Sequence, residues 1–249
     1  MAQEKYVAYV GTYTHENSIG IHVYDIDMEK GKLTERSVAP ISNPSNIAVA
    51  HSGKYLYSIE DEGVASFSID ENGDLTKINQ AWIGGMRACY VEIDSNDRYL
   101  FLAGFHDGKV TMMRLNEDGS IAGIADGVFH QGVGKSSVEK RMDPRVSCTK
   151  LTPDEKYLCA VDWGLNQIKI YEVDYEEGKL HLYDILRFPF NSAPRRIRFS
   201  KDGKFAYVLE ETTNMVDIYT YDLREGKPVF EKIKTTSVLE KEDSLASSF

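Results

Sequence analysis

The sequence has little cysteine, no excess of positive charge and no long apolar run. Only three of its 249 residues are cysteines, Cys89, Cys148 and Cys159, and no two of them form a Cys-x-x-Cys pair. This spacing suggests neither a disulfide framework nor a zinc site, so we expect buried, reduced thiols. The histidines also lack metal-ligand spacing, and we expect neither a metal nor a cofactor. The formal net charge of −10 argues against an electrostatic hold on nucleic acid or on an anionic membrane.

Two further absences bear on location. Residues 1–5 lead directly into the apolar alternation of residues 6–10, which leaves no room for the parts of a secretory signal. No apolar run approaches the roughly eighteen residues that a membrane helix requires. We therefore expect a soluble, cytoplasmic protein.

What the sequence does contain is a repeat. A short phrase of a turn residue, a polar residue, an aromatic and two more strand formers recurs at residues 53–57, 97–101, 155–159 and 203–207, with a degenerate copy at 6–10. We take Tyr9, Tyr57, Phe101, Cys159 and Tyr207 as equivalent anchor residues of the five copies, and the intervals between them are 48, 44, 58 and 48 residues. Intervals of this length are typical of the blades of a β-propeller. We interpret the repeated aromatics as packing between blades.

The residues around each phrase alternate as strands do. Short alternating runs separated by Gly, Asp and Asn precede and follow it, for example residues 45–50, 64–69 and 75–78. Four strands joined by hairpin-length turns form one antiparallel blade, which must stack on its neighbours to bury its faces. The fold class predicted is therefore all-β, a propeller of four-stranded antiparallel blades. The Gly-His and Trp-Asp marks of WD40 repeats are absent.

The longest interval, from Phe101 to Cys159, holds about ten extra residues. The excess falls in residues 132–145, a stretch rich in Gly, Lys and Arg. A loop of this length inside a compact domain is more often functional than idle.

Five segments, in this order along the chain, together resemble the lactonase family of seven-bladed β-propellers, of the 6-phosphogluconolactonase type. They are residues 9–14, 43–45, 130–132, 161–165 and 193–208. The resemblance runs from Tyr6 to about Thr236. It implies a hydrolase that opens a sugar lactone, 6-phosphoglucono-1,5-lactone to 6-phosphogluconate in the pentose phosphate pathway, with a phosphosugar lactone as its small-molecule partner and no required metal.

The first departure from the family is length. Five repeats are visible where the family has seven blades, so we expect residues 1–249 to be a single propeller domain that lacks the C-terminal blades. A ring closed with five blades is the alternative. An open ring would expose sheet edges and blade faces, which favours self-association.

The second departure concerns two motifs. Where the family commonly has Pro-His-Pro-His, residues 144–147 read Pro-Arg-Val-Ser, and where it has Gly-Pro-Arg-His, residues 193–196 read Ala-Pro-Arg-Arg. Both changes remove imidazoles that could move protons. The resemblance retains the arginine at Arg195 and an acidic residue at Glu211.

Opening a δ-lactone requires a base for the attacking water and donors for the developing oxyanion. We assign Glu211 as the base and Arg195 as its catalytic partner. Candidate substrate-binding residues that would complete an anion pocket are Arg196, Arg145, Arg141, Lys140, His106 and His130. The plain alternative is that these charges pair with one another across a polar channel. Asp162 is expected to cap the turn into Gly164.

Two functions from different classes remain open. The first is the lactone hydrolase that the resemblance implies. The second is a non-catalytic propeller that binds an anionic ligand or a protein partner, since a fold does not determine a function.

Overall fold

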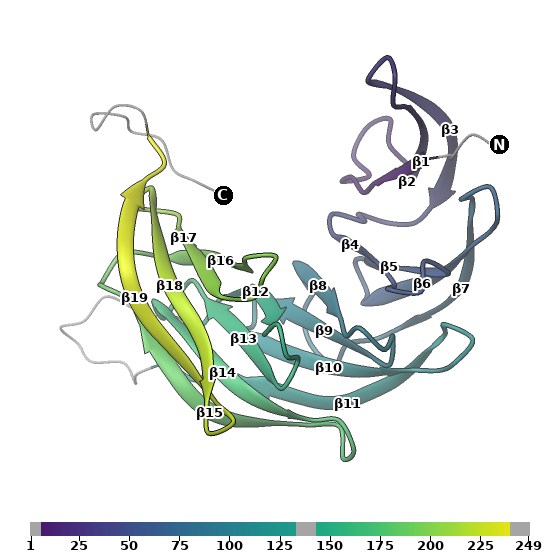
Figure 1. Ribbon diagram of the computed structural model, residues 1–249. Coiled ribbons are helices and arrows are strands. Elements are labelled where there is room, and N and C mark those ends of the chain that lie inside the picture. Colours follow the sequence, from purple (N-terminus) through teal and green to yellow (C-terminus); the bar gives the residue numbers. More distant parts are fainter. Residues whose placement is uncertain (1–5, 133–142, 240–249) are drawn as a thin grey trace. The chain divides into compact units, whose positions relative to one another are not determined.

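The computed structural model describes residues 6–132 and 143–239, and all regular secondary structure in these ranges is β-strand. The strands form five sheets, each in chain order (Figure 1). The first sheet is β1 (Tyr6–Val10), β2 (Gly20–Asp27) and β3 (Lys32–Pro40). The second is β4 (Ile47–Val49), β5 (Tyr55–Ile59), β6 (Val64–Ile69) and β7 (Leu75–Ala81).

The other three sheets repeat this four-stranded plan. The third sheet is β8 (Tyr90–Ile93), β9 (Tyr99–Gly104), β10 (Lys109–Leu115) and β11 (Ile121–Phe129). The fourth is β12 (Val146–Leu151), β13 (Tyr157–Asp162), β14 (Gln167–Asp174) and β15 (Lys179–Arg187). The fifth is β16 (Pro194–Phe199), β17 (Phe205–Glu210), β18 (Met215–Arg224) and β19 (Lys227–Ser237).

The repeated phrase has the same structure in every four-stranded sheet. Its first residue has a positive φ in each copy, namely Gly53, Asp97, Glu155 and Gly203. Each of these residues donates its backbone N–H to the carbonyl of the residue three positions earlier, which closes a tight turn between the first and second strands. The predicted anchors Tyr57, Phe101, Cys159 and Tyr207 all lie on the second strand of a sheet, and Tyr9 lies on β1. The repeat is therefore confirmed.

Tyrosines of this phrase connect one sheet to the next. The hydroxyl of Tyr9 donates to the carbonyl of Gly73 at 2.8 Å, that of Tyr57 to Gly119 at 3.1 Å, and that of Tyr157 to Gly226 at 3.0 Å. Each acceptor lies in the turn between the third and fourth strands of a following sheet. The interpretation of these aromatics as packing between blades is confirmed.

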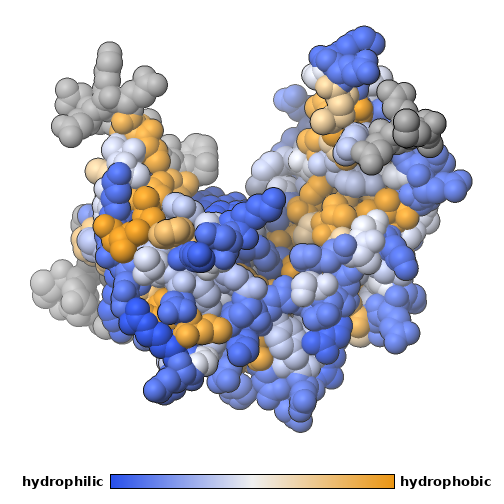
Figure 2. Space-filling model, viewed as in Figure 1, coloured by the Kyte–Doolittle hydropathy of each residue, from blue (hydrophilic) through white to orange (hydrophobic). Residues whose placement is uncertain are grey.

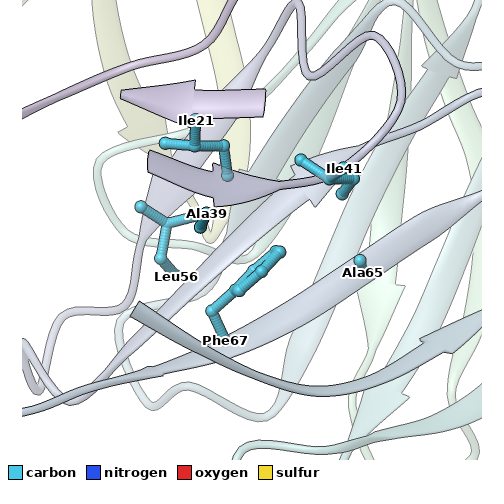
Figure 3. Packing of buried hydrophobic residues seen from close by; sticks show 6 residues of the cluster. All are labelled: Ile21, Ala39, Ile41, Leu56, Ala65 and Phe67. Carbon is cyan, nitrogen blue, oxygen red and sulfur yellow. The ribbon is translucent and has the colours of Figure 1, made fainter. Parts of the chain in front are cut away.

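Apolar side chains from adjacent sheets form the core. In one cluster, Ile21 and Ala39 of the first sheet and Ile41, which follows β3, pack against Leu56, Ala65 and Phe67 of the second sheet (Figure 3). Each is at most 8% exposed. Every residue of β9 and of β13 is buried, which places these second strands inside the fold.

The chain divides into two compact units, one of residues up to 100 with 113–124, the other of residues 101–112 with those from 125 onward. The boundary passes through the third sheet. The single domain over residues 1–249 remains a prediction. Figure 2 shows a mostly hydrophilic face with apolar areas between the charged ones, and exposed apolar side chains include Trp82 and Phe190.

The expectation of buried thiols is confirmed for Cys148 and Cys159, which are buried free thiols, and is wrong for Cys89, which is partly exposed. Burial raises the pKa of the Cys159 thiol. Within the described ranges there is no helix long and apolar enough to span a membrane, and no group of three or more His, Cys, Asp or Glu that could hold a metal ion.

Candidate active site

The site lies where first strands begin and second strands end. In an antiparallel pair these two points share one edge of the sheet. Val146 of β12 faces Asp162 of β13, and Pro194 of β16 faces Glu210 of β17. Arg145 and Trp163 therefore lie next to each other beyond the edge of the fourth sheet. The backbone N–H of Trp163 donates to the Arg145 carbonyl at 2.9 Å.

The fifth sheet repeats this arrangement with Ala193 and Glu211, and Arg195 follows at the start of β16. The Glu211 N–H donates to the carbonyl of Ala193 at 3.0 Å, which fixes the turn after β17 against the start of β16. The strand pairing has an irregularity between Pro194 and Arg196, and β12 has one between Val146 and Cys148. Bulges of this kind redirect side chains at the end of a strand.

The phenyl ring of Phe105 lies beneath both arginines. Phe105 follows β9 in the turn of the third sheet, and its ring centroid lies 5.3 Å from Cζ of Arg145 and 5.3 Å from Cζ of Arg195. The Arg145 guanidinium also lies 6.0 Å from the ring of Trp163, so it contacts two aromatic faces. Aromatic rings attract a guanidinium electrostatically and hold its plane in position.

Glu211 has one engaged carboxylate oxygen. Its Oε2 accepts the indole N–H of Trp163 at 3.1 Å and lies 3.4 Å from Nε of Arg195. Among the described residues, Oε1 of Glu211 has no partner. The side chains of Arg195 and Glu211 are 26% and 20% exposed, so the pair is open to small solutes.

The two arginines keep N–H groups available. No acceptor among the described residues takes a hydrogen bond from the Arg145 guanidinium or from the Nη atoms of Arg195. Arg87 in the other unit is different. It donates to the Asn43 carbonyl and to the Ser45 hydroxyl, and it pairs with Asp61 at 3.3 Å. Arg87 is therefore held by protein partners, whereas Arg145 and Arg195 have donors left for a ligand.

A buried pair lies behind Arg145. Oδ1 of Asp162 accepts the backbone N–H of Arg145 at 2.9 Å and that of Leu165 at 3.0 Å, which confirms the predicted capping role. Oδ2 of Asp162 lies 2.7 Å from Nδ1 of His130, and both side chains are fully buried. Burial lowers the pKa of His130 despite the carboxylate beside it, so the imidazole is neutral and donates from Nδ1.

Sequence-predicted residues fall into four groups. Arg195, Glu211 and Arg145 come together around Phe105, and His106 is an exposed neighbour whose ring meets the edge of that phenyl group at 5.9 Å. Arg196 is directed elsewhere, because its Nη1 donates to the Ser147 carbonyl at 3.0 Å. Lys140 and Arg141 lie outside the described residues. His130 is buried behind the arginines.

Sequence reasoning missed Phe105 and Trp163. Both occupy one register position of the repeat, the first residue after the second strand, which Glu211 occupies in the fifth sheet. Alignment of the repeats at that position is the signal that finds them. This register position distinguishes Glu211 from Glu210, which is the last residue of β17, is buried and has its pKa raised by burial.

The described cluster holds two guanidinium groups and one carboxylate. This balance favours an anion, and the forked donors of arginine match the oxygens of a phosphate or carboxylate. A carboxylate with one uncommitted oxygen beside such donors can take a proton from water while the donors stabilise negative charge.

Comparisons with known proteins identify the family and the fold. The sequence model of the family described as "Lactonase, 7-bladed beta-propeller" matches residues 7–248. The 6-phosphogluconolactonase of Bacillus subtilis is 34% identical over 241 residues, which cover 94% of this chain and 67% of that protein. An uncharacterized protein of Staphylococcus saprophyticus is 32% identical, with 86% of this chain and 63% of that protein covered.

Solved structures show the same fold. A putative 6-phosphogluconolactonase from Bacteroides fragilis has a TM-score of 0.83 at 28% identity, with 94% of this chain and 67% of that one covered. The periplasmic gluconolactonase of Pseudomonas aeruginosa has a TM-score of 0.84 at 28% identity, with coverages of 94% and 68%. The chain thus spans about two thirds of the length of the relatives it matches.

Proposed function

The chain belongs to the lactonase family of seven-bladed β-propellers, and on that basis we propose that it hydrolyses 6-phosphoglucono-1,5-lactone to 6-phosphogluconate. One observation carries the proposal. Arg145 and Arg195 share the ring of Phe105 and offer unused donors beside Glu211, whose Oε1 has no partner among the described residues.

Glu211 is the general base in this proposal. Its Oε1 accepts a proton from a water molecule, and the water oxygen forms a bond to C1 of the lactone. Trp163 and Arg195 hold Oε2, which orients the carboxylate before the reaction. Positioning of this kind supplies part of the rate enhancement, because the base then needs no rearrangement in the transition state.

Arg195 stabilises the oxyanion that forms on C1. When this tetrahedral intermediate collapses, the C1–O5 bond breaks, and the ring oxygen takes the proton from Glu211. The products are a carboxylate and a free hydroxyl, and the proton released by the new carboxylic acid goes to solvent. Removing one donor of an oxyanion typically costs about 2.7–4 kcal/mol of transition-state stabilisation.

Arg145 binds the 6-phosphate. Its guanidinium is held flat by Phe105 and Trp163, and its N–H groups have no acceptor among the described residues. Binding energy from a remote phosphate orients the lactone at the reacting carbon. The imidazoles that the family commonly has are replaced here by Arg145, Ser147 and Arg196, which leaves the proton transfer to Glu211.

Three finer points stay proposals with this one. The partner is a small phosphosugar lactone, the location is cytoplasmic, and the chain self-associates through exposed sheet edges. The second candidate function, a non-catalytic propeller that binds an anion, is favoured by the arginines that stand in place of histidines at positions 145 and 196.

A comparison of two lactones tests the proposal. We expect wild type to hydrolyse 6-phosphoglucono-1,5-lactone with a lower KM than glucono-1,5-lactone, which lacks the phosphate. Arg145→Ala should remove most of that preference, because its loss acts on the phosphate alone. Arg195→Ala should instead lower kcat for both lactones. If wild type has no preference for the phosphorylated lactone, the phosphate-binding assignment is wrong.

A further inference from the structure

His130 is buried, ionisable and unused by the mechanism above. Its side chain is fully buried, Nδ1 faces Asp162 at 2.7 Å, and Nε2 has no hydrogen-bond partner among the described residues. Leaving a buried ring nitrogen unpaired costs stability, and an apolar side chain would pack at such a position without that cost. The imidazole must therefore make a polar interaction that a hydrocarbon side chain cannot make. Among the described residues, the only polar contact of the His130 ring is with Asp162.

The His130 ring acts on the structure through the carboxylate of Asp162. This carboxylate accepts three N–H groups: those of Arg145 and Leu165 at Oδ1, and that of the His130 ring at Oδ2. The carboxylate is itself fully buried, so each of these donors stabilises its charge and fixes its rotamer. Without the His130 donor, Oδ2 would be a buried charged oxygen with no partner among the described residues.

Arg145 depends on this carboxylate for its backbone position. Its N–H is bound by Asp162 at 2.9 Å, and its carbonyl accepts the N–H of Trp163 at 2.9 Å. The chain passes closely here, since a Cβ on Gly164 would lie 1.9 Å from the carbonyl oxygen of Asp143. The guanidinium can lie over Phe105 and Trp163 only while this backbone is held.

His130 also binds the turn between β9 and β10 through its backbone. Its backbone N–H donates to the Gly108 carbonyl at 2.9 Å, and Gly108 ends the turn that carries Phe105. One residue thus contacts the turn that bears the aromatic surface and the carboxylate that holds the arginine.

We propose that His130 and Asp162 are a positioning pair that holds Arg145 over Phe105 for recognition of the phosphate or carboxylate of an anionic substrate. The proposal deepens the function proposed above and rests on it for the identity of the substrate. Neither residue touches the substrate; both act through Arg145.

Three substitutions of His130 separate positioning from packing. Asn places an amide donor near the position of Nδ1, Gln reaches toward that of Nε2, and Leu removes the donor but fills the space. The readout is the Kd for 6-phosphogluconate, measured by calorimetry, together with kcat and KM for the lactone. We expect His130→Leu and His130→Gln to raise the Kd about tenfold or more, and His130→Asn to stay within about threefold of wild type.

The same substitutions in an Arg145→Ala background complete the test. If His130 acts through Arg145, His130→Gln should change the Kd less than twofold when the arginine is already gone. An equal effect in both backgrounds, or equal losses for Asn and Gln, would mean a general structural role and overturn the proposal. The Asn and Gln pair keeps the test valid if the Leu variant does not fold.

Failure of the inference and failure of the proposed function give different results. A wild type that binds 6-phosphogluconate through Arg145 but does not hydrolyse the lactone refutes the hydrolase and leaves the positioning pair intact. If wild type hydrolyses the lactone but the His130 substitutions leave the Kd for 6-phosphogluconate unchanged, the positioning pair is refuted and the hydrolase stands. No measurable binding of 6-phosphogluconate by wild type overturns the pair as proposed.

Discussion

Trp163 donates its indole N–H to Oε2 of Glu211 at 3.1 Å, from a turn of one sheet to a turn of the next. The same oxygen lies 3.4 Å from Nε of Arg195. This shared oxygen leaves Oε1 as the atom on which the proposed proton transfer depends. The relationship makes Trp163 an orienting residue for the base.

The indole donor can be removed without removing the ring. We expect Trp163→Phe to lower kcat by roughly tenfold, since a hydrogen bond to a charged group contributes about 1.5–3 kcal/mol and tenfold in rate corresponds to about 1.4 kcal/mol. KM should change little because a ring still lies beside Arg145. Trp82, which is 68% exposed, provides the matched control: Trp82→Phe should leave both constants unchanged. An unchanged kcat in Trp163→Phe would show that Glu211 needs no such orientation.

Arg145→Lys tests whether the flat guanidinium matters beyond its charge. Lysine keeps the charge but presents a single ammonium group, which neither stacks on Phe105 and Trp163 as a plane nor donates in a fork. We expect KM for the phosphorylated lactone to rise about tenfold with kcat within about threefold of wild type. The control is Arg224→Lys, an exposed surface arginine paired with Glu231. A normal KM in Arg145→Lys would reduce the role of Arg145 to that of a point charge.

The buried His130 predicts a pH dependence of stability. Burial lowers its pKa, with a smaller contribution from Lys169, while Asp162 acts in the opposite direction. Above its unfolded pKa of about 6.5, neither state binds the proton and His130 has no effect on pH dependence. Below that value the unfolded chain binds a proton that the folded chain does not, so stability falls as the pH drops, by at most about 1.4 kcal/mol per pH unit.

The measurement compares urea unfolding of wild type and His130→Asn at pH 7.5 and pH 5.5. Burial also raises the pKa values of Glu60 and Glu210, and the difference between the two proteins removes the contribution of such groups. Wild type should lose more stability than the variant on acidification, by about 1 kcal/mol. A larger loss in the variant would mean that protonated His130 is stabilised by Asp162.

Self-association is expected from the first sheet. β1 lies at the end of the order β1-β2-β3, and no described strand pairs with its other edge. An unpaired edge is a template for another strand, and a lysine on it discourages pairing. We expect sedimentation to show concentration-dependent association that Ala8→Lys reduces. A wild type that stays monomeric at high concentration would contradict this.

Most of the fold could be predicted because its information is local. Turn residues and alternation placed the strand at residues 64–69 with the bounds that the structure gives it, and four of the five anchors fall on the second strands of their sheets. The segment of residues 132–145 was predicted as the place of the extra length, and it lies between β11 and β12. The long interval is therefore an insertion between sheets and leaves the strands intact.

The candidate site was less predictable because it depends on which way individual side chains point. Arg195 and Arg196 are adjacent in sequence, yet the irregular pairing at the start of β16 sends one to Phe105 and the other to Ser147. The contact between His130 and Asp162 joins residues 32 apart through the packing of two sheets, which no spacing rule predicts. Phe105, by contrast, was recoverable from the register of the repeat.

The central claim is that Glu211 activates water for opening of the lactone. The direct test follows consumption of freshly prepared 6-phosphoglucono-1,5-lactone by wild type, Glu211→Gln and, as a matched control, Glu176→Gln in an exposed turn. All rates are corrected for spontaneous hydrolysis in the same buffer. We predict that wild type and Glu176→Gln exceed the spontaneous rate equally, and that Glu211→Gln loses about a hundredfold or more in kcat with KM little changed. A wild-type rate no higher than the spontaneous one, or full activity in Glu211→Gln, would contradict the claim.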